Sequence, residues 1–188
     1  MKSNYIILFV FLICSFSFSQ EKDDLFNMIE QKDDQIELLP EKMIFTQSIL
    51  WGEKGLFRKT GISPLNLENR EKELKIRKTM LTAHQAIGYL TLASMVAQGI
   101  IGGKLHNGQD DLYNTHKTMG KIVNIGYFTG AGLSLFSPPP LINKKVKGLN
   151  SIKAHKMLAT LHFSAMVATN YYKDKNKSNH KAAAYTAF

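Results

Sequence analysis

The stretch HQAIGYLTLASMVAQGIIGG, residues 84–103, decides the fold, because its opening pattern recurs three times further along the chain. The later copies begin HKTMGK at His116, HKMLAT at His155 and HKAAAY at His180. Each copy places Gln or Lys directly after the histidine and a small residue four positions after it. Residues i and i+4 share one face of an α-helix, so each copy sets an imidazole beside a flat helix surface. The small residues are Gly88, Gly120, Ala159 and Ala184.

Three apolar segments dominate the second half of the chain, at about residues 80–103, 113–136 and 151–172. Segments of about 22 to 24 helical residues are long enough to cross a hydrocarbon core of about 30 Å. They are rich in Gly, Ala, Ser and Thr, which is typical of packed membrane helices, and short links make neighbours antiparallel. The sequence therefore predicts an all-α fold, an antiparallel transmembrane helix bundle with three full spans and a short C-terminal fourth helix. We expect helices over about 66–103, 113–136, 151–172 and 179–188 within a bundle domain of residues 66–188.

The composition fits membrane flanks better than nucleic-acid binding. The chain has 188 residues, a formal charge of +9 and a mean hydropathy of −0.16, an average that hides the apolar segments. Lysines cluster in the links between those segments, and no zinc-finger or RNA-binding motif accompanies them. The sole cysteine, Cys14, lies in the N-terminal apolar stretch, which excludes disulfides from the rest of the chain.

Residues 1–19 have the pattern of a secretory signal peptide: Lys2, an apolar run and a small-x-small site before Gln20. An uncleaved anchor and a lipoprotein signal at Cys14 are the alternatives, and Ile13 before the cysteine disfavours the second. Cleavage would place the N-terminal region on the extracytoplasmic side of a cell membrane, the inner membrane in a Gram-negative bacterium. Basic residues before residue 80 favour the opposite orientation by the positive-inside rule.

Residues 20–65 form a polar or interfacial N-terminal region. It contains the only tryptophan, Trp51, close to Arg58 and Lys59. This combination is typical of a segment that lies against lipid headgroups. A small loop that caps the bundle is the alternative interpretation.

The histidines that open the segments should form pairs. In an antiparallel bundle the first and third segments begin on one side of the membrane, and the second and fourth begin on the other. His84 should therefore face His155, and His116 should face His180. Two facing imidazoles can supply both axial ligands of a b-type haem. The alternative interpretation is that these histidines lie at the membrane boundary and only cap the helix ends.

These features resemble the cytochrome b561 family, whose core is four membrane helices that carry two haems. The resemblance covers residues 79–188 and implies haem b as the cofactor, in two sites, with His84, His155, His116 and His180 as iron ligands. It also implies that Gly88, Gly120 and Ala159 lie beside the porphyrins and that Lys117 and Lys156 pair with propionates. The fourth helix is short for this family, which predicts a frayed end, a weaker His116/His180 site and a chain that is part of a longer one.

The resemblance implies a membrane-bound b-type cytochrome, a transmembrane electron-transfer oxidoreductase. Its partners would be membrane lipid and a small-molecule or protein electron donor and acceptor, and a homodimer is left open. A cofactor-free structural or accessory membrane protein is the alternative. A metal transporter with His84, His155 and His162 as ligands is disfavoured because the segments lack carboxylates; His162 fits a hydrogen-bonded core histidine better.

Overall fold

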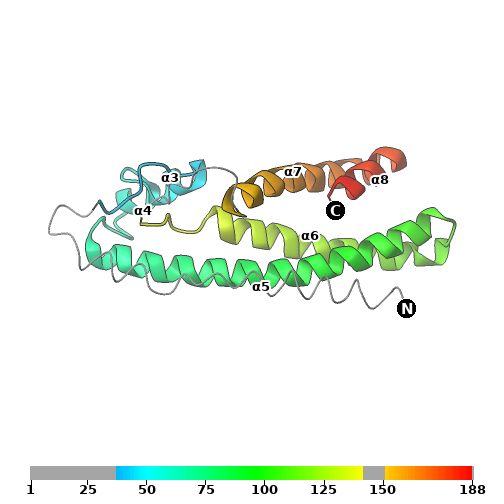
Figure 1. Ribbon diagram of the computed structural model, residues 1–188, viewed down its shortest axis with the longest axis horizontal. Coiled ribbons are helices and arrows are strands. Elements are labelled where there is room, and N and C mark those ends of the chain that lie inside the picture. Colours follow the sequence, from blue (N-terminus) through cyan, green and yellow to red (C-terminus); the bar gives the residue numbers. More distant parts are fainter. Residues whose placement is uncertain (1–36, 142–150, 188) are drawn as a thin grey trace. The chain divides into compact units, whose positions relative to one another are not determined.

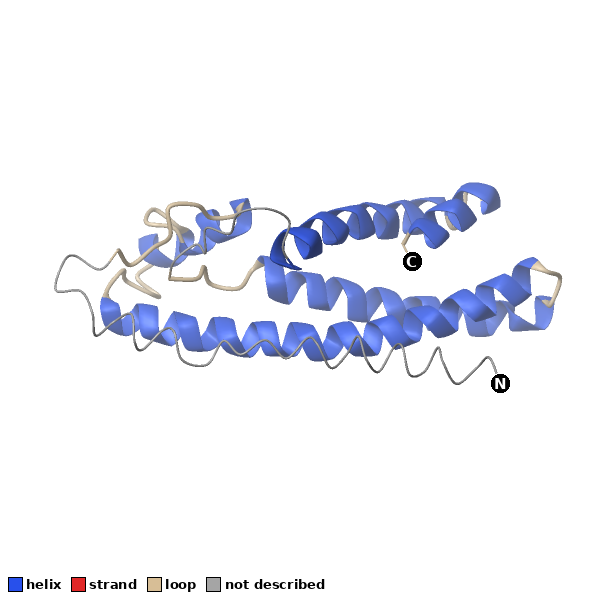
Figure 2. Ribbon diagram, viewed as in Figure 1, coloured by secondary structure: helices blue, strands red, loops and turns tan. Residues whose placement is uncertain are grey.

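The computed structural model describes residues 37–141 and 151–187. The chain divides into two units, Met1–Glu37 and Leu38–Phe188, and nearly all of the described residues belong to the second. The predicted signal peptide, residues 20–36 and the lysine-rich link at 142–150 lie outside the described ranges. Within those ranges the regular structure is helical and contains no strand (Figure 2), which confirms the all-α fold class.

The helices begin and end close to the expected positions. α5 is one unbroken helix, and the Asn66 side chain caps it by accepting a hydrogen bond from the Asn69 main-chain N–H at 2.9 Å. Asn176 caps α8 in the same way through Asn179, so α8 begins two residues earlier than expected. The elements are α3 (Phe45–Trp51), α4 (Leu56–Lys59), α5 (Leu67–His106), η1 (Asp110–Leu112), α6 (Tyr113–Leu135), α7 (Ser151–Tyr172) and α8 (Lys177–Thr186).

Two helical hairpins make up the bundle: α5 packs along α6, and α7 packs along α8 (Figure 1). Gly108, with φ of 94°, provides the left-handed turn that lets the chain reverse after α5. The first hairpin is tightly packed at Gly126, where an added Cβ would lie 2.5 Å from Thr91 Oγ1. Small residues therefore allow the backbones to approach, as the composition of the segments predicts.

A small hydrophobic core joins the two hairpins at mid-length. It contains Met95 from α5, Val123 from α6, Ala165 and Met166 from α7, and Ala187 directly after α8. Tyr127 of α6 packs against this cluster. All four long elements thus contribute to one core, which fixes the second hairpin against the first.

Among the described helices, α5 is the one that is both long and apolar enough to cross a membrane, by length and composition alone. α6 and α7, with 23 and 22 residues, have the length, but neither contains an 18-residue stretch that is apolar enough to meet the same test. Three full spans therefore remain a prediction. In α6 and α7, lysines, amides, hydroxyls and imidazoles interrupt the aliphatic residues, so no long apolar stretch forms.

Residues 38–66, which we call the cap, pack against the beginning of α5 and the end of α6. Trp51 Nε1 donates a hydrogen bond to the Phe136 carbonyl at 3.0 Å, and the Thr46 hydroxyl donates to the Leu135 carbonyl. From α5, Arg70 donates to the Leu38 carbonyl at 2.7 Å and to the Pro139 carbonyl at 3.2 Å. The cap therefore belongs to the bundle unit rather than to a separate N-terminal domain.

A buried ion network holds the cap in place. The Glu73 carboxylate accepts hydrogen bonds from Arg58 and Ser63 of the cap and from Arg70 of α5. Glu73 and Arg70 are each 1% exposed. The Arg58 side chain is turned into this network and is only 6% exposed, so for this residue the capping interpretation is the correct one.

Acid should weaken the cap through Glu73. Burial by itself raises the pKa of Glu73, but the hydrogen bonds from Arg58, Ser63 and Arg70 outweigh it and hold that pKa below the usual 4.5. A lowered folded-state pKa gives stability that is complete above the unfolded value and is lost as the pH falls through the folded value. We expect Trp51 fluorescence to report loosening of the cap below about pH 4.5.

The matched variant is Glu73→Gln, which keeps the shape but leaves two buried guanidinium groups without their carboxylate. Breaking such a pair costs about 3–5 kcal/mol, so the variant should unfold at a lower denaturant concentration at pH 7. It should also lack the acid transition of the wild type. An unchanged acid transition in Glu73→Gln would assign that transition to another group.

Candidate functional site

The structure brings the four repeat histidines together in two pairs, one from each hairpin in both cases. The ring centres of His84 on α5 and His155 on α7 lie 6.3 Å apart, with an interplanar angle of 79°. The rings of His116 on α6 and His180 on α8 are also 6.3 Å apart, at 89°. These are the pairs that antiparallel alternation predicts.

One histidine of each pair is held by a main-chain carbonyl of the neighbouring helix in its own hairpin. His84 Nδ1 lies 2.9 Å from the Gly130 oxygen, and His180 Nδ1 lies 2.9 Å from the Thr169 oxygen. A carbonyl oxygen only accepts, so Nδ1 must carry the proton in both rings. The lone pair of each imidazole is therefore on Nε2, where a metal can bind it.

The two anchoring bonds follow the same register. Gly130 comes 14 residues after His116 on α6, and Thr169 comes 14 residues after His155 on α7. Fourteen residues are close to four turns, so each of these helices carries a histidine at one level and an anchoring carbonyl on the same face about 21 Å away. The bundle thus has two equivalent histidine levels with the hydrophobic core between them.

His116 has different surroundings, because its ring contacts Gln98 and Gly102 of α5 and has no main-chain carbonyl like those that hold His84 and His180. Gly102 lies flat against its ring, where an added Cβ would be 2.9 Å from Cε1. Gln98 Nε2 donates to the His116 carbonyl at 3.0 Å and lies 3.4 Å from its Nε2. Among the described residues, His116 Nδ1 and Gln98 Oε1 are buried without a hydrogen-bond partner. Each of these two atoms could therefore form one more hydrogen bond.

The separation within each pair suits a metal with two axial imidazoles. A metal–nitrogen bond is about 2 Å long and each nitrogen lies about 1.1 Å from its ring centre, so two imidazoles on opposite sides of one metal would have ring centres about 6 Å apart. Both observed pairs have this separation. A haem needs only two protein ligands because the porphyrin supplies the other four. In the part of the chain that the structure describes, no cluster of three or more His, Cys, Asp and Glu could hold a metal ion, so His84, His155 and His162 form none.

The other candidate residues lie near the histidines but do not all have equivalent surroundings. An added Cβ at Gly88 would meet nothing within 4 Å, whereas one at Gly120 would lie 3.1 Å from Gln98 Nε2. Ala159 is exposed on α7, one turn after His155. Lys117 and Lys156 are exposed directly after their histidines. Gly88 and Ala159 thus leave open helix surface beside the first pair, and Gly120 also serves helix packing.

His162 occupies the middle of the bundle, seven residues from both His155 and Thr169 on α7. Its ring lies 4.9 Å from the Tyr127 ring and hydrogen-bonds to the main chain of Ala187. Ala187 is 3% exposed and ends α8. His162 therefore pairs with a polar group that the last described turn of α8 would otherwise leave without a partner, and the frayed end stays a prediction.

Several of these residues were not identified from the sequence: Gly102, Gly130, Gln98 and Thr169. The usable signal was the 14-residue spacing that places Gly130 and Thr169 four turns after a histidine.

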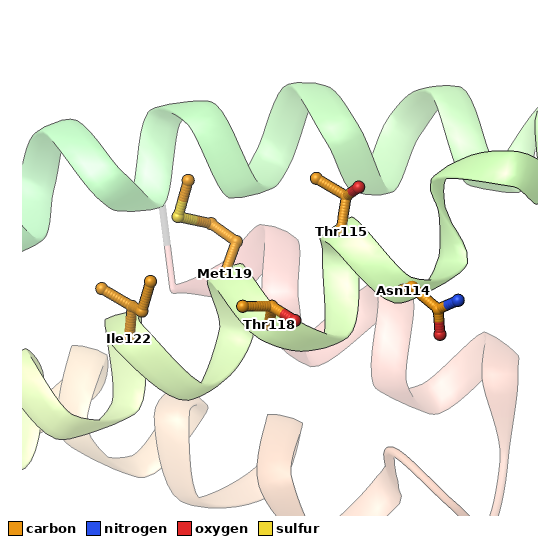
Figure 3. A pocket seen from close by; sticks show the side chains of 5 residues that line it. All are labelled: Asn114, Thr115, Thr118, Met119 and Ile122. Carbon is orange, nitrogen blue, oxygen red and sulfur yellow. The ribbon is translucent and has the colours of Figure 1, made fainter.

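The surface pockets of the described residues do not mark the histidine pairs. A pocket of about 340 Å³ is lined by residues of α6 alone (Figure 3), and one of about 310 Å³ lies between α5 and α6, with none of the four repeat histidines in either lining.

Replacement of His162 by Leu should loosen the end of α8. Losing a hydrogen bond worth about 1 kcal/mol should speed amide exchange in the last turn of α8 roughly fivefold. Hydrogen exchange measured by mass spectrometry over residues 183–187 tests this. His106→Leu, at the exposed end of α5, is the control and should change nothing there; equal protection in both variants would exclude the capping role.

Comparisons with protein-family models, with curated proteins and with solved structures give no match to this chain. The resemblance to the cytochrome b561 family therefore depends on the histidine spacing, the small residues and the helix order. The histidine pairing itself is an observation of the structure. The metal bound there and the activity remain predictions.

Proposed function

We propose that this chain is a membrane-bound b-type cytochrome that passes electrons through two bis-histidine haems. His84 and His155 would hold one haem, and His116 and His180 the other. The observation that carries the proposal is that both pairs have the same 6.3 Å ring separation although they involve four different helices. If the histidines served only as polar helix ends, nothing would require the two pairs to have the same ring separation.

The contacts of the histidines support ligation over a purely structural role. The hydrogen bonds to the Gly130 and Thr169 carbonyls fix the tautomer of His84 and His180 and hold both rings in place. Such bonds also make an imidazole a stronger ligand. Haem would supply the one-electron chemistry, and the protein would set its potential through ligands, burial and hydrogen bonds. A small-molecule or protein donor would deliver electrons at one level and an acceptor would remove them at the other.

Membrane placement is part of the proposal. α5 is apolar enough to span, and α6 and α7 would span beside it at about 1.5 Å rise per residue. Their polar groups pair within the bundle: Asn170 Nδ2 donates to Asn124 Oδ1 at 2.6 Å, and His162 contacts Tyr127. Polar side chains that are paired inside a bundle are tolerated at membrane depth, which explains how helices of modest hydropathy can lie in lipid.

The direct test is the absorption spectrum of the purified protein, oxidised and then reduced with dithionite. We expect a Soret band that shifts on reduction and up to two haems per chain, since both pairs have the same ring separation, with the lower occupancy at the His116/His180 pair. His84→Ala and His155→Ala should each remove the same haem and leave the other spectrum intact. His106→Ala should keep both. Absence of haem after expression with sufficient haem would leave the cofactor-free accessory protein as the better reading.

Gly88→Leu separates cofactor binding from folding. An added Cβ at Gly88 meets no neighbouring atom within 4 Å and Gly88 is exposed, so the apoprotein should be as stable as wild type. The same side chain lies one turn from His84, on the surface assigned to the porphyrin, and haem content at the first pair should fall severalfold. Ala86→Leu, exposed on the same helix, is the matched control. Equal losses of haem in the two variants would show that Gly88 does not face the cofactor.

A further inference from the structure

α3 turns two large apolar side chains outward. Its inner face contains Thr46, Gln47, Leu50 and Trp51, and Gln47 is only 7% exposed. Its outer face presents Phe45 and Ile49, one helical turn apart, with Phe45 79% exposed. A surface helix normally buries its apolar face and exposes its polar one. The exposure of Phe45 and Ile49 on one side of α3 departs from this rule.

Hydrogen bonds explain why the polar face is inside. Thr46 and Trp51 donate to the carbonyls of Leu135 and Phe136 at the end of α6, where the helix leaves carbonyls without intrahelical partners. These two bonds fix the rotation of α3 about its axis. Phe45 and Ile49 are held pointing outward as a consequence, and cannot turn inward without leaving those carbonyls unsatisfied.

The outward apolar surface extends beyond α3. Leu56 and Ile62 of the cap are exposed, and so are Leu135 and Phe136 at the end of α6. Leu135 and Phe136 are also the residues whose carbonyls accept the hydrogen bonds from α3, so exposed apolar side chains occur on both elements where they meet. Lys54 and Lys59 lie exposed in the same part of the chain, and ammonium groups of this kind pair with lipid phosphates.

We propose that the cap is an interfacial membrane anchor: the outer face of α3, with Leu56 and Ile62, lies in the headgroup and upper acyl region of the lipid bilayer that surrounds the bundle. α3 lies beside the last turn of α6, about one to two turns beyond the His84 level, which is the depth of that region. Interfacial helices use large apolar residues on one side and lysines near the surface. The anchor would fix the cap, and through Arg70 and Glu73 the start of α5, relative to the membrane surface. This proposal rests on the membrane placement given under Proposed function.

Spin-label accessibility in lipid vesicles tests the anchor. In a Cys14→Ser background, which removes the sole cysteine, Phe45→Cys, Ile49→Cys and Glu53→Cys are labelled in the full-length protein. The vesicles contain phosphatidylcholine and phosphatidylglycerol, and the colliders are oxygen and a water-soluble nickel chelate. We expect the oxygen-to-nickel ratio to be severalfold higher at Phe45 and Ile49 than at Glu53, which is exposed just after α3.

Each other outcome overturns the proposal in a distinct way. High nickel accessibility at Phe45 and Ile49 would place the outer face in water. Low accessibility to both colliders would show that a protein partner or a second copy covers it. A label at Leu92, which is 54% exposed on α5, separates this proposal from the membrane placement: nickel access at Leu92 would exclude the membrane-spanning bundle itself. The haem content of the same sample reports on the cytochrome proposal independently.

Discussion

The hydrogen bond between a histidine Nδ1 and a main-chain carbonyl of the adjacent helix is the interaction on which this architecture depends. It occurs twice, at His84 with Gly130 and at His180 with Thr169, and each time it lies inside one hairpin. The bond fixes the rotation of the helix that carries the histidine and leaves Nε2 directed away from the acceptor. The partner histidine then comes from the other hairpin, so each pair requires both hairpins to be in register.

Where the cap meets the end of α6, side chains again donate hydrogen bonds to main-chain carbonyls of a neighbouring segment. The chain after α6 enters three consecutive prolines, which lack N–H groups and cannot continue a helix, yet their carbonyls need donors. Arg70 and Arg77 supply them, with Arg77 Nη1 2.7 Å from the Pro138 oxygen. Glu73 in turn forms ion pairs with both Arg70 and the incoming Arg58. The polar beginning of α5 is thus an internal structure that holds the cap and the end of α6 together, although its charge pattern has the appearance of a solvated helix.

The sequence carried enough information for the helices and for the histidine pairs. A histidine at the start of each segment, together with short links, determines which rings share a level, and no other feature was needed. The contacts of the cap could not be predicted from the sequence, because Arg70 and Pro139 are 69 positions apart and no neighbouring residue marks either one as a partner of the other. Nor did the sequence carry the role of His162: a polar residue in an apolar segment fits several partners, and only the packing of α8 shows that Ala187 is the one.

The last turn of α8 is held by contacts with the neighbouring helices of the bundle. A helix of 10 residues cannot cross a bilayer, and an isolated end at that depth would leave main-chain carbonyls without donors. In this bundle the end of α8 coincides with the hydrophobic core, since Ala187 is one of its members. His162, midway between the two histidine levels on α7, reaches the same point. An imidazole of the neighbouring helix thus pairs with the main chain at the last described turn of α8, where the carbonyls have no intrahelical partners.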